Sequence, residues 1–594
     1  MRPRLAVKAD RPVVGSTNRR LNLWYWLLVA IAVIFMGRLF YLQVVKGDLY
    51  RRQALAGQLK QYTIAAPRGV ISAHDGGKLV PIVLNQTLYT LYADPVYIKD
   101  PKATAQKVAA ITGGDSAEYA RAMSKSNSRY VVLAKKINDD QKNKIAELKI
   151  AGVGSQAQDY RVYPQGSLAA QLLGFVNDEG KGTYGLEQAL NQELAGAPGA
   201  LKAITDAAGV PLAASSENTQ VPARPGSQVV LTLDAAMQKQ LENLLKEGLD
   251  KARSASGSAL IMDPNSGAIK AMANWPSYDP AQYSSVSDAH LFTNPAVSSP
   301  LEVGSIMKIL TTSAALNMGV INPDTSYDDP AHWDVDGHTI TNIEEDGGPG
   351  RHTIAEVLNL SINTGATWML MQMGGGQLNQ KGRVAWHDYL VNHFRLGKST
   401  GIEQGYESPG VVPDPNDGYA LNLTYANTAF GQAITATPLQ MAAALSSVLN
   451  GGTYYRPHLV DKIIEPSGRE TVKKPEAVRQ NVVSSTVSSQ IKPLMEYVAA
   501  NHHLQPPFSD NYSVGGKTGT AQIASPAGGY YTDRFNGTYY GFVGGDKPQY
   551  VVFVRVNEPH IGGYAGSGAA QPIFTAIGHM LINNFNVAPK GSTP

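Results

Sequence analysis

Hydrophobic residues are concentrated in one stretch near the N-terminus. Residues 23–36 are all apolar, and the apolar run extends to residue 45 with Arg38 as its only charged side chain. About 20 mostly apolar residues are enough to cross a bilayer as a helix. Residues 54–56 have the small-x-small form of a cleavage site, but charged residues separate them from the apolar run. The pattern therefore predicts an uncleaved transmembrane anchor over residues 23–45.

The region that follows, residues 46–225, alternates short strand-like and helix-like patterns. Polar–apolar alternation and helical periodicity predict strands over 58–65 and 87–92 and helices over 101–112, 139–149 and 187–194. Residues 213–227 are rich in Ser, Ala and Pro, a composition typical of a linker. We expect a mixed α/β domain that ends in this linker.

Residues 226–585 carry the pattern of a second, larger domain. A strand over 228–233 leads into an amphipathic helix over 235–251, with Asp234 as its N-cap. Further strands are predicted over 258–262, 268–273, 512–523, 538–543 and 550–556, with a closing helix over 572–583. Two early and three late strands thus flank a long helical middle. We predict an α+β domain with one five-stranded antiparallel sheet, helices on its faces and a helical subdomain.

The composition is that of a globular protein and narrows the possible chemistry. The 594 residues are 43% hydrophobic, with 51 Lys+Arg against 48 Asp+Glu, a balance that gives no case for nucleic-acid binding. Cysteine is absent, which excludes a disulfide framework, a cysteine nucleophile and cysteine-ligated metals. The first 22 residues hold six basic residues and one acidic residue. The positive-inside rule therefore places this tail in the cytoplasm and the chain from residue 46 onward outside it.

Three short motifs supply candidate chemistry. Ser305 and Lys308 lie three residues apart in a helical pattern, where a neutral lysine on the same face can activate the serine hydroxyl as a nucleophile. Ser361 and Asn363 offer a hydroxyl that can relay protons and an amide that can hold a substrate carbonyl. Residues 517–520, Lys-Thr-Gly-Thr, offer an ammonium group and two hydroxyls for a carboxylate. Each motif alone carries little information.

Two other kinds of site are disfavoured. Residues 516–518 imitate the end of a phosphate-binding P-loop, but that motif requires glycine at position 511, which is Asn511, and it opens a helix rather than lying along a strand. His502 and His503 have no metal-binding pattern around them, and we interpret them as part of a solvated loop. We expect no metal and no cofactor.

Together and in this order, the motifs match the signature of penicillin-binding proteins. The chain resembles the class B penicillin-binding proteins, which are membrane-anchored peptidoglycan D,D-transpeptidases, and the FtsI-like division enzymes among them more than the elongation enzymes. The likeness extends to Arg-Gly-Val-Ile at 68–71 and Gly-Thr-Tyr-Gly-Leu-Glu at 182–187. Val303 and Ile306 depart from it, since the family usually has Pro and Thr there, and so do residues 73–76, which replace an Asp-Arg-x-Gly sequence.

The resemblance implies a role for each motif residue. Ser305 attacks the penultimate carbonyl of a stem peptide ending in D-Ala-D-Ala, and Lys308 takes the serine proton. Ser361 relays a proton to the leaving amine, with Lys517 tuning the pair. The remaining implied roles are donor-peptide binding by Asn363, binding of the terminal carboxylate by Thr518, Gly519 and Thr520, and an oxyanion hole formed by the backbone N–H groups of Ser305 and Thr520.

The resemblance also implies partners and a domain order. The expected partners are stem peptides, β-lactams, the membrane, and a SEDS-family glycosyltransferase with other cell-wall machinery. The expected order is a cytoplasmic basic tail (1–22), the anchor (23–45), a pedestal domain of the penicillin-binding protein dimerisation type (46–225), the transpeptidase domain (226–585) and a flexible tail (586–594).

Two alternative functions stay open. The first is a D,D-carboxypeptidase or β-lactam sensor, in which water replaces the acceptor amine. No Glu-x-x-Leu-Asn sequence like that of class A β-lactamases follows Ser361, which favours a long-lived acyl-enzyme over fast hydrolysis. The second is a catalytically silent membrane scaffold that regulates a glycan polymerase.

Overall fold

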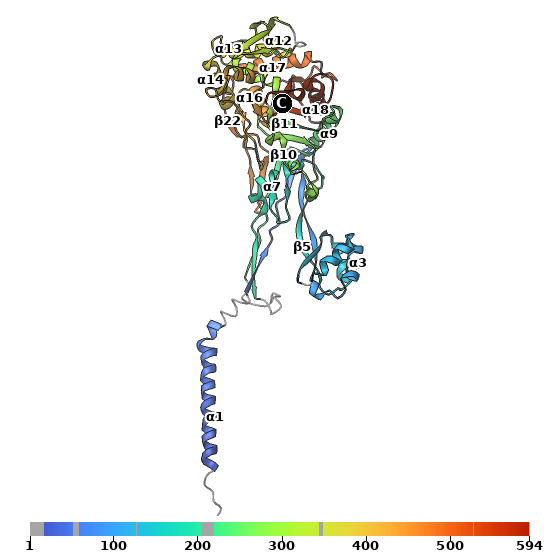
Figure 1. Cartoon of the computed structure of the whole chain (residues 1–594), viewed down its shortest axis with the longest axis vertical. Helices are drawn as coiled ribbons and strands as arrows, with labels where there is room; N and C mark the ends of the chain where they lie inside the picture. Colours follow the sequence, from blue (N-terminus) through green and yellow to red (C-terminus); the bar gives the residue numbers. More distant parts are fainter. Residues whose placement is uncertain are drawn as a thin grey trace, which may run out of the picture. The chain divides into compact units, whose positions relative to one another are not determined.

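The computed structural model describes residues 17–50, 59–125, 127–204, 219–343, 348–526 and 528–592 (Figure 1). The chain divides into two compact units, one formed by residues 1–66 and 197–224 and the other by residues 67–196 and 225–594. The second unit therefore contains residues from both of the predicted extracytoplasmic domains.

The first unit begins with the predicted apolar helix. Helix α1 (Thr17–Phe40) continues into a single π-helical turn, η1 (Tyr41–Val45). The stretch Arg19–Val45 is long and apolar enough to cross a membrane. This helix is consistent with a single-pass membrane anchor.

A small sheet completes the first unit. Strands β1 (Leu59–Ile64), β8 (Gly199–Ile204) and β9 (Thr219–Val221) are antiparallel, in the order β1-β8-β9. Strand β1 confirms the strand predicted over 58–65. The linker prediction over 213–227 is wrong at residues 219–221, because these residues pair with β8. Residues 213–218 lie outside the described residues.

The second unit contains a seven-stranded sheet in the order β21-β20-β10-β2-β3-β4, with β5 also paired to β3. Its strands are β2 (Ile71–Asp75), β3 (Lys78–Ala93), β4 (Val131–Ile137), β5 (Val153–Val162), β10 (Gln228–Asp234), β20 (Val460–Ile464) and β21 (Glu470–Val472). Strand β10 runs parallel to β2 and antiparallel to β20. Because β2 and β10 lie on opposite sides of residue 225, this sheet joins the two regions that the sequence predicts as separate domains, residues 46–225 and 226–585.

Two short helices of this region begin next to residues whose side chains cap the helix N-terminus. Helix α3 (Pro101–Thr112) has the predicted bounds, and the Asp100 carboxylate accepts the Ala103 N–H at its N-terminus. Helix α5 (Asp139–Glu147) begins at a capping box and ends two residues before the prediction. The helix predicted over 187–194 is instead two helices, α7 (Gly185–Ala189) and α8 (Asn191–Ala195), because Leu190 has the non-helical angles φ −109° and ψ 26°.

The five-stranded antiparallel sheet is confirmed. Its strands are β11 (Ser256–Met262), β12 (Ile269–Trp275), β23 (Ser513–Ala524), β24 (Tyr530–Gly544) and β25 (Pro548–Asn557). They pair in the order β12-β11-β25-β24-β23, with β23 at one edge. The predicted strand over 538–543 covers only the buried half of β24, because the exposed half lacks the apolar alternation that marks a strand.

Helices cover both faces of this sheet. On one face, α9 (Ala235–Lys251) and α18 (Gln571–Asn584) pack against Val552 and Val554. The alternate residues Val551 and Phe553 point to the other face. The core on that face includes α11 (Met307–Asn317), α16 (Pro438–Leu449) and α17 (Ser485–Asn501). Helix α11 is buried from Met307 to Leu316, so it is the central helix of the domain.

The described part of the predicted flexible tail, residues 586–592, is held to this domain. Val587 is buried. The Ala588 N–H donates to Gln549 Oε1 at 2.9 Å, and the Lys590 N–H donates to the Asn511 carbonyl at 2.7 Å. These contacts make this segment part of the folded domain.

Candidate active site

The first motif lies where a tight turn enters the central helix. Ser305 is in a 3-10 turn, η5 (Gly304–Ile306), and α11 begins directly after it. Gly304 has φ +65°, and a Cβ at this position would lie 2.7 Å from the Thr520 carbonyl oxygen. Only glycine allows the turn to approach strand β23 this closely. The turn is therefore built to bring Ser305 next to the third motif.

Lys308 connects the first motif to the second. The residue is 1% exposed. Its Nζ lies 3.0 Å from Ser305 Oγ, 3.1 Å from Ser361 Oγ and 2.8 Å from Asn363 Oδ1, and it also contacts the Ser361 carbonyl oxygen. A neutral amine in this position has both serine hydroxyls within reach for proton transfer. Lys308 is thus in direct contact with three other predicted functional residues, Ser305, Ser361 and Asn363.

The second motif forms the junction between α12 (Ile354–Asn359) and α13 (Asn363–Met373). Ser361 has φ +57°, in the left-handed region that serine rarely adopts. Such a conformation costs about 1–3 kcal/mol and persists where surrounding contacts impose it. The Asn363 Nδ2 donates to the Thr341 carbonyl at 3.1 Å, which fixes the amide with Oδ1 toward Lys308.

The third motif, residues 517–520, lies on the edge strand β23. Lys517 is 0% exposed, and its Nζ donates to the Thr518 carbonyl at 3.2 Å and to Thr518 Oγ1 at 3.4 Å. A Cβ at Gly519 would lie 2.7 Å from the Val303 carbonyl oxygen. The strand therefore passes close to the Ser305 turn at the position that has no side chain.

A cavity of about 790 Å³ opens over this centre. Ser305, Asn363 and Thr520 line it, together with strand β16 (His338–Thr341) and residues 563–565. Lys308, Ser361, Lys517, Thr518 and Gly519 are not among its lining residues. The arrangement places the predicted nucleophile at the cavity wall, with the buried lysine that contacts it behind that wall.

The two departures from the family pattern near Ser305 are buried. Val303 and Ile306 are both 0% exposed. The Val303 carbonyl accepts the Thr538 hydroxyl at 3.1 Å, and an Ile306 methyl group faces Gly519. Neither residue lines the cavity. Their side chains are buried in the core and form no part of the cavity wall.

Two residues at the site were not identified from the sequence. Glu302 lies three residues before Ser305, and its Oε1 accepts the Tyr530 hydroxyl and the Ala433 N–H, both at 2.9 Å. Burial raises the pKa of Glu302, although both hydrogen bonds act in the opposite direction.

The second residue that the sequence did not identify is His502, for which the interpretation as part of a solvated loop is wrong. Its ring is partly buried and bonded to the Asn359 carbonyl at 3.1 Å. No local sequence pattern signals either contact, because each joins segments that are distant in the chain.

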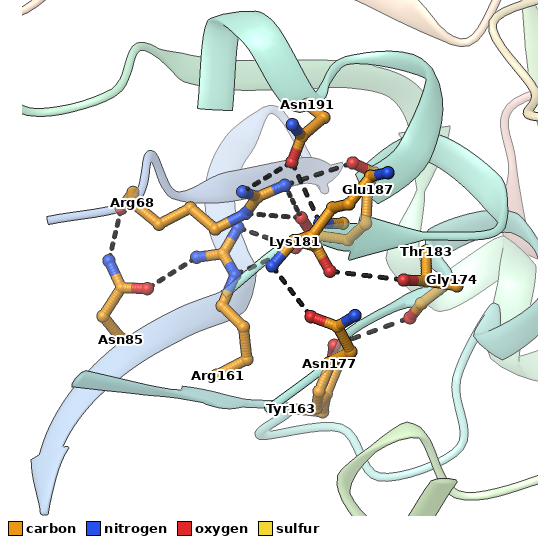
Figure 2. A network of polar contacts seen from close by, with 11 residues as sticks. Arg68, Asn85, Arg161, Tyr163, Gly174, Asn177, Lys181, Thr183, Glu187 and Asn191 are labelled. Carbon is orange, nitrogen blue, oxygen red and sulfur yellow. Dashed lines mark hydrogen bonds and ion pairs between the residues drawn. The ribbon is translucent and has the colours of Figure 1, made fainter. Parts of the chain in front are cut away.

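A second polar centre, shown in Figure 2, surrounds Glu187 in the pedestal region. Glu187 is 0% exposed; Arg68 Nε donates to its Oε2 at 2.7 Å, and Arg161 Nε donates to its Oε1 at 2.9 Å. Asn191 Oδ1 accepts from Arg68 at 3.0 Å, and Asn85 Oδ1 accepts from Arg161 at 2.8 Å. Burial lowers the pKa of Arg68, an effect that Glu187 opposes. The 68–71 and 182–187 sequences named above thus meet in one buried ion network.

Comparisons with known proteins agree with this architecture. Residues 257–579 match the penicillin-binding protein transpeptidase domain, and residues 63–231 match the penicillin-binding protein dimerisation domain. Stage V sporulation protein D of Bacillus subtilis is 30% identical over 97% of this chain and 88% of its own length. Peptidoglycan D,D-transpeptidase FtsI of Escherichia coli is 25% identical over 99% and 96%. The crystal structure of penicillin-binding protein 3 from Mycobacterium tuberculosis in complex with aztreonam is 25% identical, has a TM-score of 0.66, and covers 89% of this chain and 98% of its own.

The α+β sheet domain and the dimerisation domain before it define a penicillin-binding transpeptidase. The chain belongs to the class B penicillin-binding proteins, as the sequence resemblance implied. The family activity is peptidoglycan transpeptidation, and the family binds stem peptides and β-lactams.

Proposed function

We propose that this chain is a serine-type D,D-transpeptidase of septal peptidoglycan synthesis, with Ser305 as the residue that becomes acylated. The observation that carries the proposal is the position of Lys308 Nζ, which lies within 3.1 Å of Ser305 Oγ, Ser361 Oγ and Asn363 Oδ1. A nucleophile, its base and a proton relay are thereby in direct contact beside one cavity.

In the first half-reaction, neutral Lys308 accepts the Ser305 proton while Oγ attacks the carbonyl carbon of the penultimate D-Ala. The backbone N–H groups of Ser305 and Thr520 stabilise the oxyanion, and each such donor is worth about 3 kcal/mol. Ser361 passes a proton to the departing amine, and the positive charge of Lys517 favours that transfer. The C–N bond breaks, D-Ala leaves, and an ester joins the peptide to Ser305.

In the second half-reaction, the amine of another stem peptide attacks the ester carbonyl. The amine loses a proton through Ser361 and Lys308, and Ser305 Oγ regains one as the C–O bond breaks. The new amide is the cross-link. Thr518, Gly519 and Thr520 hold the donor's terminal carboxylate, and the Asn363 amide holds its backbone.

β-Lactams act on the same site. Penicillin-binding protein 3 from Mycobacterium tuberculosis has been solved with aztreonam and with ampicillin. When Ser305 opens a lactam ring, the leaving amine stays attached to the acyl group and blocks the acceptor.

The proposal includes the topology and a partner. The basic tail lies in the cytoplasm, the bulk of the chain lies outside, and a SEDS-family glycosyltransferase binds to the anchor and pedestal.

The test is intact-mass spectrometry of the full chain in detergent after incubation with benzylpenicillin, beside Ser305→Ala. We expect a gain of one drug mass on the wild type, persisting for hours, and none on the variant. An adduct that disappears within minutes favours water as the acceptor. No adduct on the folded wild type refutes the proposal and leaves the silent scaffold.

A further inference from the structure

His502 joins the helix before the third motif to the turn that carries Ser361. It is the C-cap residue of α17. Its Nε2 lies 3.1 Å from the carbonyl oxygen of Asn359, the last residue of α12. A carbonyl oxygen only accepts, so Nε2 carries the hydrogen. The ring thus holds the chain two residues before Ser361, where the backbone enters its left-handed conformation.

The backbone of His502 is tied to the other side of the site. Its carbonyl accepts the side-chain amide of Gln571 at 3.1 Å. Gln571 begins α18 and directly follows the π-helical turn η8 (Gly566–Ala570). The Gly566 N–H in that turn donates to Thr520 Oγ1 at 3.1 Å. His502 is therefore placed between the Ser361 turn and the segment that touches the third motif.

The charges around the ring favour its neutral form. Burial lowers the pKa of His502, and the positive charge of Lys517 on β23 and the neighbouring His503 lower it further, whereas the hydrogen bond to Asn359 raises it. Helix α12 presents an uncharged carbonyl to the ring, and the Gln571 amide of α18, also uncharged, binds the backbone carbonyl of His502. Protonation of His502 would add a second cation beside Lys517.

We propose that His502 is a positioning residue for the Ser361 turn and that its neutral form maintains the active arrangement of Ser361, Lys308 and Lys517. This inference rests on the proposed function. Protonation of His502 at low pH therefore slows the acylation of Ser305, and this effect is separate from any effect of Lys308.

The test compares second-order rate constants for benzylpenicillin acylation of the full chain between pH 5 and 8. His502→Gln keeps a donor that reaches the Asn359 carbonyl but cannot titrate, His502→Ala removes the donor, and His503→Gln is the matched control beside it. At pH 8 we expect His502→Ala to lose about tenfold, the usual effect of one partly buried hydrogen bond, and His502→Gln to stay within about threefold.

The decisive quantity is the ratio of the His502→Gln rate to the wild-type rate, because every other titratable group is present in both proteins and its effect on the rate cancels in the ratio. Because the pKa of His502 is lowered from its ordinary value of 6.5, we expect this ratio to rise only when the pH falls below that lowered pKa, and then by up to about tenfold per pH unit. The same ratio for His503→Gln stays flat. A flat ratio for His502→Gln, or a wild-type rate for His502→Ala at pH 8, overturns the positioning role while the proposed function stands. Absence of acylation in the wild type at every pH overturns both.

Discussion

Replacing Glu187 by glutamine tests whether the buried ion network stabilises the pedestal region. The carboxylate is 0% exposed, and the two arginines it pairs with, Arg68 and Arg161, are 9% and 5% exposed. Their closest N···O distances are 2.5 Å and 2.8 Å. Glutamine keeps the shape of the side chain but removes the negative charge, so two buried cations then face each other without a counter-charge. Removing one partner of a buried pair costs about 3–5 kcal/mol.

The assay is urea unfolding of the full chain in detergent, with two probes. None of the six tryptophans lies in residues 46–225: two lie in helix α1 and four in the transpeptidase region. A urea-dependent change in tryptophan fluorescence therefore does not come from the pedestal region, whereas far-ultraviolet circular dichroism follows both regions. We expect Glu187→Gln to move the first circular-dichroism transition to lower urea, by an amount equivalent to about 3–5 kcal/mol.

Two controls separate burial from charge. Asp250→Asn breaks the exposed pair between Lys246 and Asp250, whose side chains are 46% and 61% exposed, and is expected to cost less than about 1 kcal/mol. Adding Arg161→Met to Glu187→Gln removes one uncompensated cation and is expected to restore part of the lost stability. If Glu187→Gln costs no more than Asp250→Asn, the network is not a stabilising element and this reasoning is wrong.

Three further predictions concern the catalytic region. Lys308→Met should slow acylation by about 10²–10⁴-fold because it removes the proposed general base, as measured by stopped-flow with a fluorescent penicillin; a loss under tenfold contradicts that role. Asn363→Ala removes an acceptor for Lys308 and a donor to Thr341, and should slow acylation about tenfold in the same assay. For Glu302, burial raises the folded-state pKa above its ordinary value of 4.5, so its contribution to stability is complete below pH 4.5 and is lost as the pH rises through the folded-state pKa. Glu302→Gln should therefore melt higher, relative to the wild type, at pH 8 than at pH 5, and an unchanged difference refutes this.

The sequence predicts elements better than it predicts their boundaries and contacts. Helix α9 has the predicted bounds because Asp234 and the apolar periodicity mark both its start and its face. The five strands of the central sheet were predictable because each contains a run of buried, mostly apolar residues. Strand β9 was not, because a short edge strand of polar residues has the composition of a linker.

The order of the motifs and their resemblance to a known family pointed to the motif residues, but the sequence did not predict how these residues are arranged in space. The three-residue spacing places Lys308 beside Ser305 on any helix. No spacing places Ser361 or Asn363 against the same amine, because those contacts span more than 50 residues. His502 illustrates the same limit, since a histidine pair without a ligand pattern has the local signature of a solvated loop, and only the folded chain shows its contact with Asn359.

The central helix explains why the three motifs meet. Helix α11 is buried from Met307 to Leu316, so it must be surrounded by other elements. The second motif borders α13, which packs against α11, and the third motif lies on β23, which packs against the η5 turn at the start of α11. Gly304 and Gly519 remove the side chains that would separate the Ser305 turn from β23, and Lys308 gives the second motif a polar partner inside an apolar core. A buried amine requires hydrogen-bond acceptors, and Ser305, Ser361 and Asn363 supply them. The contacts that satisfy the buried lysine are therefore the contacts that assemble the proposed catalytic centre, so packing and the proposed chemistry depend on the same residues.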